Sequence, residues 1–368
     1  MKKLFFLFFA LMFLFACKKD NSVVSDNNNN PNPNPTLDTL YFPPIGNSVW
    51  QTQSIDSAGW NASLVNDLYS YLDSKNTKAF IVLKNGKIVL EKYFGTFTVD
   101  SLWYWASAGK TATALLTGIA QQEGLLDINQ KTSYYLGTGW TSLPLIKENL
   151  ITVRHQLTMT TGLDDAVADD YCTLSSCLQY KADAGTRWAY HNAPYTLMDS
   201  VLQSATGMTL NAYFKQKIRD RIGMNGAWIR NGYNNVYYSN ARSMARFGLL
   251  MLNKANWNGT PILQDSSYFN AQTNSSQTIN LSYGYLTWLN GKGSHMLPTL
   301  QNVFSGYMIP NAPADLYAAL GKNDQKIYVV PSQKLVVIRM GNAAGNVQLA
   351  LSSFDNELWG KLKAMIGY

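Results

Sequence analysis

Histidine and cysteine are scarce in this chain, which has three of each among 368 residues. The histidines are His155, His191 and His295, and no two of them lie at the spacing of metal ligands. The cysteines have no nearby set of partner ligands. The sequence therefore predicts no metal centre, and we expect no cofactor.

Charged residues make up only 14% of the chain, and the formal net charge is +7. Lys2 and Lys3 belong to a segment that we expect to be removed, which leaves about +5 spread without clusters. No basic patch indicates a nucleic-acid partner. The chain also lacks a Gly-x-Ser-x-Gly elbow, which argues against an α/β-hydrolase.

The first residues have the pattern of a secretory signal peptide. Two lysines precede an apolar run from Leu4 to Phe15, which is too short for a spanning helix. We expect residues 1–16 to be the signal peptide. The run ends in Leu14-Phe15-Ala16-Cys17, which resembles a bacterial lipobox, and this implies that Cys17 carries a lipid anchor. The alternative is a conventional cleaved signal followed by a buried cysteine.

Residues 17–45 contain Asn27 to Asn30 and alternating proline and asparagine, with almost nothing apolar to bury. This composition predicts a disordered linker that tethers the protein to a membrane. The expected location is the bacterial envelope, at the outer membrane. The Lys18-Lys19-Asp20 run resembles the surface-export signals of Bacteroidetes-type lipoproteins, so both a periplasmic and a surface position stay open.

Cys172 and Cys177 are separated by four residues. In the oxidising compartment that a signal peptide implies, this spacing favours a disulfide that closes a small loop.

Residues 46–368 show no second linker, and we expect one catalytic domain of two lobes. Leu64, Val65, Leu68 and Leu72 predict an amphipathic helix over 61–74, and Asn85-Gly86 predicts a hairpin over 78–94. Residues 107 to about 307 have helical patterns and long loops. Strand patterns return at 316–320, 326–330 and 334–340, before a helix that carries Phe354 and Leu358. The expected fold class is α/β (α+β), with an antiparallel sheet from both chain ends and a mainly helical lobe.

Ser107 and Lys110 have the spacing of a nucleophile and its base. Residues three apart share one face of a helix, so the Lys110 amine can reach the Ser107 hydroxyl. A serine at a helix N-terminus also lies among free backbone N–H groups, which can hold a negative oxygen. The bland alternative is an N-cap serine with a solvated lysine one turn later.

Tyr190 and Asn192 supply a second proton carrier and an amide on the same side of an extended loop. Other Tyr-x-Asn triplets begin at Tyr233, Tyr238 and Tyr268, but only this one follows Gly185-x-x-Trp188 and precedes a helix ending in Thr206-Gly207. The order of these motifs resembles the serine β-lactamase and penicillin-binding-protein superfamily. The resemblance spans roughly Leu64 to Ile366 and implies a β-lactamase/transpeptidase-like fold.

The family closes its site with a strand bearing a Lys-Thr-Gly or His-x-Gly triplet. Lys322-Asn323-Asp324 and the following Gln325 resemble that strand, but the small residues are replaced. We expect Asp324 to bring a negative charge to the substrate side. Lys322 is either a substrate-binding cation or a solvated lysine at a strand end.

The resemblance implies that Ser107 forms an acyl-enzyme, with Lys110 and Tyr190 as proton carriers. Asn192 and Lys322 would contact substrate, and the backbone amides of Ser107 and Gln325 would hold the oxyanion. The implied activity is cleavage of an amide or ester in a small molecule or peptide. The implied type is that of class C β-lactamases, esterases, DD-peptidases and 6-aminohexanoate-dimer hydrolases. His155 lies in a family-like segment, and we interpret it as structural. The alternative function is a catalytically impaired, surface-anchored binding lipoprotein of the same fold.

Overall fold

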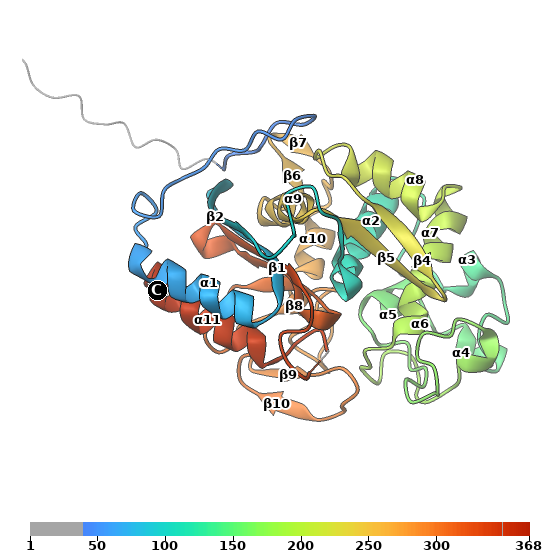
Figure 1. Ribbon diagram of the computed structural model, residues 1–368. Coiled ribbons are helices and arrows are strands. Elements are labelled where there is room, and N and C mark those ends of the chain that lie inside the picture. The colour runs from blue at the N-terminus through green and yellow to red at the C-terminus, as the bar shows by residue number, and fades with distance from the viewer. Residues whose placement is uncertain (1–39, 348) are drawn as a thin grey trace, which may run out of the picture. The chain divides into compact units, whose positions relative to one another are not determined.

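The main sheet is antiparallel and takes strands from both ends of the described chain. The computed structural model describes residues 40–368 except residue 348. The strand order is β2-β1-β13-β12-β11-β8 (Figure 1). The bounds are β1 Thr77–Lys84, β2 Lys87–Tyr93, β8 Trp288–Leu289, β11 Tyr317–Gly321, β12 Gln325–Val330 and β13 Leu335–Gly341. The predicted sheet from both chain ends is confirmed.

The hairpin β1–β2 turns at Asn85 and Gly86, which both have positive φ angles, 52° and 80°. Two such residues in succession match the turn that joins twisted antiparallel strands, so the Asn-Gly prediction is confirmed. β1 pairs on its other side with β13, in a register that places Ile81 opposite Ile338. Residues 79–83 are all buried, because helices cover both faces of this part of the sheet.

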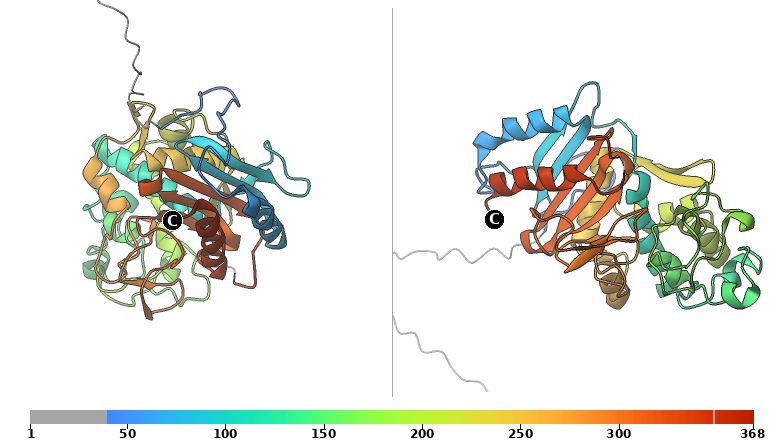
Figure 2. Two further views of the ribbon diagram at one scale, coloured as in Figure 1. Left: turned by 90° about the vertical axis from the view of Figure 1, so that its left-hand side faces the viewer. Right: turned by 90° about the horizontal axis from the view of Figure 1, so that it is seen from below.

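Two helices from opposite chain ends cover one face of the sheet, and a third covers the other. α1 (Val65–Ser74) and α11 (Ser353–Ile366) run side by side in Figures 1 and 2. Between these helices, the ring of Tyr71 stacks on that of Phe354 with their centroids 6.0 Å apart. On the opposite face, α9 (Ala241–Leu252) packs against β1, β12 and β13. The predicted helices over 61–74 and at the C-terminus are confirmed.

The segment between the sheet strands is mainly helical, as predicted. Besides α9, its α-helices are α2 Gly109–Gln122, α3 Ser133–Leu136, α4 Leu145–Glu148, α5 Val153–Leu157, α6 Asn192–Thr196, α7 Met198–Thr206, α8 Leu210–Phe214 and α10 Ser266–Gln272. The sequence patterns do not predict the short strands of this segment. They are β8, whose bounds are given above, and β4 Ala227–Asn231, β5 Asn234–Ser239, β6 Asn256–Trp257, β7 Thr260–Pro261, β9 Ser294–Met296 and β10 Val303–Ser305. β5 pairs with β4 and with β3 (Trp103–Tyr104). Asparagine and tyrosine dominate β5, so the alternation that marks a half-buried strand is weak.

Residues 40–45 are bound to the domain, although the sequence analysis assigned them to the linker. The Tyr41 N–H donates to Asn85 O at 2.9 Å, and the Arg246 guanidinium donates to Pro43 O at 3.3 Å and Pro44 O at 2.8 Å. The prolines were interpreted as linker residues, but their carbonyl oxygens satisfy a cation that is only 5% exposed. The predicted signal peptide and Cys17 lie outside the described residues.

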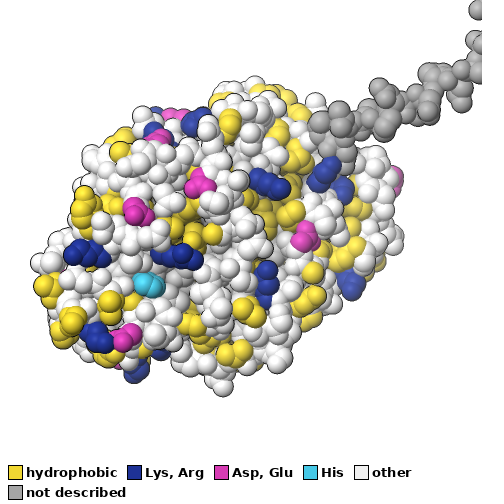
Figure 3. Space-filling model, turned by 180° about the vertical axis from the view of Figure 1, so that it is seen from behind, with side chains coloured by type: hydrophobic (Ala, Val, Ile, Leu, Met, Phe, Trp, Pro, Cys, Tyr) yellow, Lys and Arg dark blue, Asp and Glu magenta, His cyan; other side chains and the backbone are white. Residues whose placement is uncertain are grey.

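In the part of the chain that the structure describes, no helix has the length and apolar character needed to cross a membrane. On the face shown in Figure 3, lysine and arginine side chains are scattered over the surface, and some of them lie beside aspartate or glutamate side chains.

Gly248 on α9 sets how closely this helix approaches the sheet. A Cβ atom at this position would lie 2.5 Å from Val336 Cγ1 and 3.1 Å from Ile327 Cγ2. We expect Gly248→Ala to lower the free energy of unfolding by about 1–3 kcal/mol, because overpacking exceeds the gain in helix propensity. Gly293→Ala is the control, since nothing lies within 4 Å of its Cβ position. Urea unfolding of both variants measures the difference, and a stabilised Gly248→Ala would contradict this packing.

Candidate active site

Ser107 lies in a tight turn between β3 and α2, within the 3₁₀ helix η2 (Ala106–Ala108). Ala106 has a φ of 48°, in the region that L-residues rarely adopt. The preceding Trp105 is fully buried, and its backbone N–H donates to Tyr237 O at 2.8 Å. The end of β11 comes so close that a Cβ atom on Gly321 would overlap Trp105 O. The backbone on both sides of the serine is thereby fixed.

Lys110 lies on the first turn of α2 and is only 3% exposed. Its Nζ donates to Asn192 Oδ1 at 3.0 Å and lies 3.5 Å from the centroid of the Tyr195 ring. Burial lowers the pKa of Lys110 to about 7, and the nearby Asp170 and Asp199 carboxylates oppose this shift. The amine is therefore partly neutral at neutral pH.

Tyr190 lies between the serine and the lysine. Its hydroxyl hydrogen-bonds with Ser107, and its ring centroid is 5.4 Å from Lys110 Nζ. The ring stacks on Trp288 of β8 at 5.6 Å. Burial raises the pKa of Tyr190 well above its usual value, so the phenol keeps its proton and can donate it.

Asn192 begins α6 and connects Lys110 to a carboxylate. Its Nδ2 donates to Asp170 Oδ2 at 2.6 Å, and its Oδ1 accepts from Lys110. The sequence pattern missed Asp170, because this loop residue lies 22 positions from Asn192 and belongs to no motif. It also missed Tyr195 and Asp199, which lie one and two helical turns beyond Asn192.

Two hollows meet at Ser107, Tyr171 and Lys322, which line both of them. The first, the Asp170 hollow, has a volume of about 270 Å³, and its further lining includes Asp170, Tyr190, Asn192, Pro298 and Thr299. The second, the Asn234 hollow, measures about 240 Å³, and its further lining includes Tyr104, Asn231, Asn234 and Tyr238. Together they give Ser107 an open space on each side.

A larger cavity of about 500 Å³ lies beside α10 and is lined by none of the predicted site residues. We place the candidate chemistry at Ser107 instead, because the hydroxyl, the amine and the phenol converge there.

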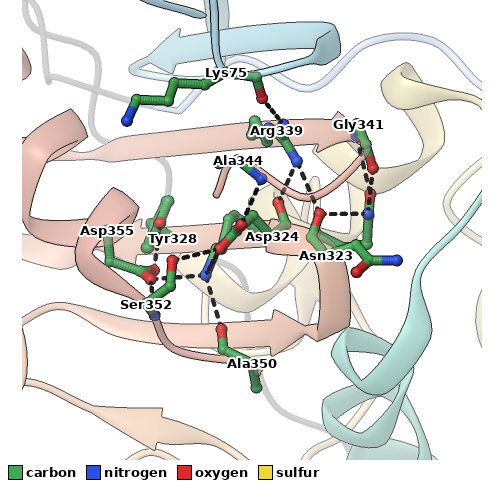
Figure 4. Close-up of polar contacts among 12 residues, drawn as sticks. Lys75, Asn323, Asp324, Tyr328, Arg339, Gly341, Ala344, Ala350, Ser352 and Asp355 are labelled. Carbon is green, nitrogen blue, oxygen red and sulfur yellow. Dashed lines mark hydrogen bonds and ion pairs between the residues drawn. The ribbon is translucent and has the colours of Figure 1, made fainter. Parts of the chain in front are cut away.

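The turn after β11 separates the residues of the third motif. Lys322 is exposed in both hollows, whereas the Asp324 side chain points into the core (Figure 4). Burial alone would raise the pKa of Asp324, but the Lys326 ammonium at 3.2 Å and further hydrogen bonds hold it below its usual value. The expectation that Asp324 brings charge to the substrate side is wrong, because its carboxylate pairs with a buried cation. Asn323 and Asp324 both have a φ of 60°, and this backbone turns the Asp324 side chain inward.

Gln325 lines neither hollow. Its side chain donates to Asn323 O at 2.9 Å and Gly341 O at 2.6 Å, and it accepts from the Gly341 N–H. The structure therefore brings Ser107, Lys110, Tyr190, Asn192 and Lys322 together and leaves Gln325 in the sheet. His155 caps α5, where its Nδ1 accepts from the Thr152 N–H at 3.1 Å, as expected of a structural residue.

Cys172 and Cys177 form a disulfide in the loop that carries Asp170 and Tyr171. Within the described residues, no three His, Cys, Asp or Glu side chains are grouped as a metal site.

The family model described as Beta-lactamase matches residues 75–357, well over half of the sequence. The chain belongs to this family. None of the curated proteins compared with the chain matches it.

Solved structures with the same fold include three that cover most of the chain. A putative 6-aminohexanoate-dimer hydrolase from Bacillus anthracis is 18% identical, with a TM-score of 0.64, over 86% of this chain and 87% of its own. A putative beta-lactamase from Bacteroides dorei is 16% identical, with a TM-score of 0.64, over 84% and 100%. A penicillin-binding protein homolog from Caulobacter crescentus is 13% identical, with a TM-score of 0.63, over 82% and 96%. These similarities establish the β-lactamase/transpeptidase-like fold, which neighbours named as hydrolases share.

The lowered pKa of Lys110 predicts a pH-dependent stability difference between wild type and Lys110→Met. The unfolded chain binds more protons at this lysine between pH 7 and its ordinary pKa of 10.5, so wild-type stability rises with pH across that window. Methionine removes this term. We expect the stability of Lys110→Met relative to wild type to fall by roughly 2–4 kcal/mol from pH 7 to pH 10, at about 1.4 kcal/mol per pKa unit.

Denaturant unfolding at both pH values measures this change, with the exposed Lys363→Met as the control. A stability difference that does not vary with pH would contradict the lowered pKa.

Proposed function

We propose that this chain is a serine hydrolase that cleaves an amide or ester bond through an acyl-enzyme on Ser107. The observation that carries the proposal is the buried Lys110, whose pKa is lowered to about 7 one helical turn from the serine. A neutral amine in this position can accept a proton, which an ordinary surface lysine cannot do at neutral pH.

In this mechanism the Ser107 Oγ forms a bond with the substrate carbonyl carbon. Its proton passes to Lys110, directly or through the Tyr190 hydroxyl with which it hydrogen-bonds. Tyr190 then gives a proton to the leaving nitrogen or oxygen as the scissile bond breaks. Water attacks the acyl-enzyme by the reverse sequence of proton transfers and releases the acid product.

The developing oxyanion needs backbone donors near Ser107. One is the Ser107 N–H at the start of the helical segment. For the second donor we propose the N–H of Lys322 in place of Gln325, because Lys322 lines both hollows and follows the glycine that touches the serine turn.

The two hollows would hold the parts of the substrate on either side of the scissile bond. The proposed substrates are small molecules or peptides with an amide or ester bond, of the kind that a 6-aminohexanoate-dimer hydrolase cleaves. The proposal includes export and a lipid anchor on Cys17, as the N-terminal sequence predicts, so that the enzyme acts in the bacterial envelope.

The alternative, a binding lipoprotein without turnover, rested on the altered third motif. The buried position of Asp324 removes the main reason for it, because the acidic charge does not reach the hollows. A covalent adduct on Ser107 after incubation with an ester panel would exclude this alternative.

A fluorophosphonate probe tests the nucleophile. We expect the wild type to be labelled and Ser107→Ala to lose labelling at least 100-fold, because the attacking oxygen is removed. Ser101→Ala, six residues earlier and outside both hollows, is the control and should label as the wild type does. Equal labelling of wild type and Ser107→Ala would refute the proposed function.

The pH dependence tests the base. Lys110 must be neutral to accept the serine proton, so we expect the labelling rate to rise with pH, with an apparent pKa near 7. The raised pKa of Tyr190 predicts no loss of rate up to pH 9. Labelling reactions quenched at fixed times from pH 5 to 9 give the dependence of this rate on pH. A rate that is flat between pH 6 and 8 would exclude Lys110 as the base.

A further inference from the structure

Asp170 holds the start of α6 by two contacts. Its carboxylate Oδ2 accepts from Asn192 Nδ2 at 2.6 Å, and its backbone carbonyl accepts from the Ala193 N–H at 2.8 Å. Asp170 also lines the hollow named after it, next to Ser107 and Tyr190. No step of the proposed mechanism uses this carboxylate.

The contact decides which way the Asn192 amide faces. A carboxylate only accepts hydrogen bonds, so it requires the NH₂ group of the amide on its side. The amide oxygen must then face Lys110, where it accepts from Nζ at 3.0 Å. In the flipped amide, the oxygen would face the Asp170 carboxylate and the NH₂ group would face the donors of the Lys110 ammonium. Both contacts would be repulsive.

The loop itself is held in place beside this contact. The Asp169 side chain accepts from the Tyr171 N–H at 3.0 Å, and its carbonyl accepts from the Cys172 N–H at 3.1 Å. The Cys172–Cys177 disulfide follows directly. Asp170 is therefore presented to Asn192 by a cross-linked loop that also carries Tyr171 into both hollows.

We propose that Asp170 is a positioning residue. It fixes the Asn192 amide with its oxygen toward Lys110, and its negative charge interacts electrostatically with the buried Lys110 amine. The catalytic importance of Asp170 rests on the proposed function. Its hydrogen bonds with Asn192 and Ala193 do not depend on whether the protein has enzymatic activity. Four side chains face Lys110 from four segments. They are Asp170 from the loop, Asp199 from α7, Tyr195 from α6 and Tyr190 from the irregular segment before α6.

The experiment compares Asp170→Asn with wild type by titration of Lys110 Cε in protein labelled with ¹³C-lysine, where Lys110→Met assigns the signal. Asp170 opposes the lowering of the Lys110 pKa, so its neutralisation should move the Lys110 midpoint down by at least about 0.5 pH unit. Asp164→Asn is the matched control. It removes the same charge from the same loop, but Asp164 pairs with Lys181 at 3.5 Å, and the midpoint should not move.

The second measurement is the rate of fluorophosphonate labelling. We expect Asp170→Asn to lower the maximal rate 10- to 100-fold, because the amide and the amine are no longer held in place. Its pH profile should shift in the same direction as the titration. Asp170→Glu keeps the charge, so it should retain the wild-type midpoint while losing part of the rate.

An Asp170→Asn titration that matches the wild type would overturn the inference, whether or not the probe labels Ser107. If Asp170→Asn does not fold, a Lys110 titration midpoint in folded Asp170→Glu that differs from the wild-type midpoint would likewise overturn the proposal. Absence of labelling in the wild type would refute the proposed hydrolase alone, because the NMR titration does not depend on it.

Discussion

The arrangement around Ser107 depends on a cation that is buried in the sheet. The Arg339 guanidinium on β13 is fully buried and donates five hydrogen bonds, four of them to backbone carbonyls and one to the Thr77 hydroxyl. Two of these carbonyls belong to Asn323 and Asp324, so the arginine holds the turn between β11 and β12 from behind (Figure 4). Lys322 lies in the same turn and lines both hollows. The same guanidinium binds Lys75 O at the end of α1 and thereby joins the two chain ends.

Such a network is weak evidence for overall stability, since the cost of burying charges offsets much of their attraction. Its effect is on geometry. Lys326 lies between Asp324 at 3.2 Å and Asp355 at 2.8 Å, so removal of Lys326 would leave two buried carboxylates without their cation, although each has further hydrogen-bond donors. Two residues in the left-handed region cost energy in the turn, and the network compensates for it. The candidate site thus combines the turn between β11 and β12, which Arg339 holds, with the loop that the Cys172–Cys177 disulfide closes.

The sequence predicted five of the six strands of the sheet, because each of these five carries a local pattern, and it missed the two-residue β8. The Asn85-Gly86 turn and the apolar runs that flank it need no knowledge of the rest of the fold. The short strand β5 was missed because its pairing with β3 and β4 is set by tertiary contacts. In the candidate site, the grouping of Ser107, Lys110 and Tyr190 could be predicted from spacing and flanking residues. The direction of the Asp324 side chain could not be, because it follows from two positive φ angles and from Arg339, neither of which a local pattern reveals. Asp170 had no pattern at all and was found only through its contact with Asn192.

The pairing of β1 with β13 also constrains how this chain can fold. β1 is rich in apolar side chains, and its edge that pairs with β13 has no partner until residues 335–341 have been synthesised, more than 250 positions later. An unpaired strand of this kind is a site of aggregation, and contacts between such distant residues form slowly. During synthesis the N-terminal hairpin must therefore be kept from pairing with other chains. Ser107 does not meet all the residues that line its two hollows until nearly the whole polypeptide has been synthesised, so a truncated or arrested product would carry this serine without them.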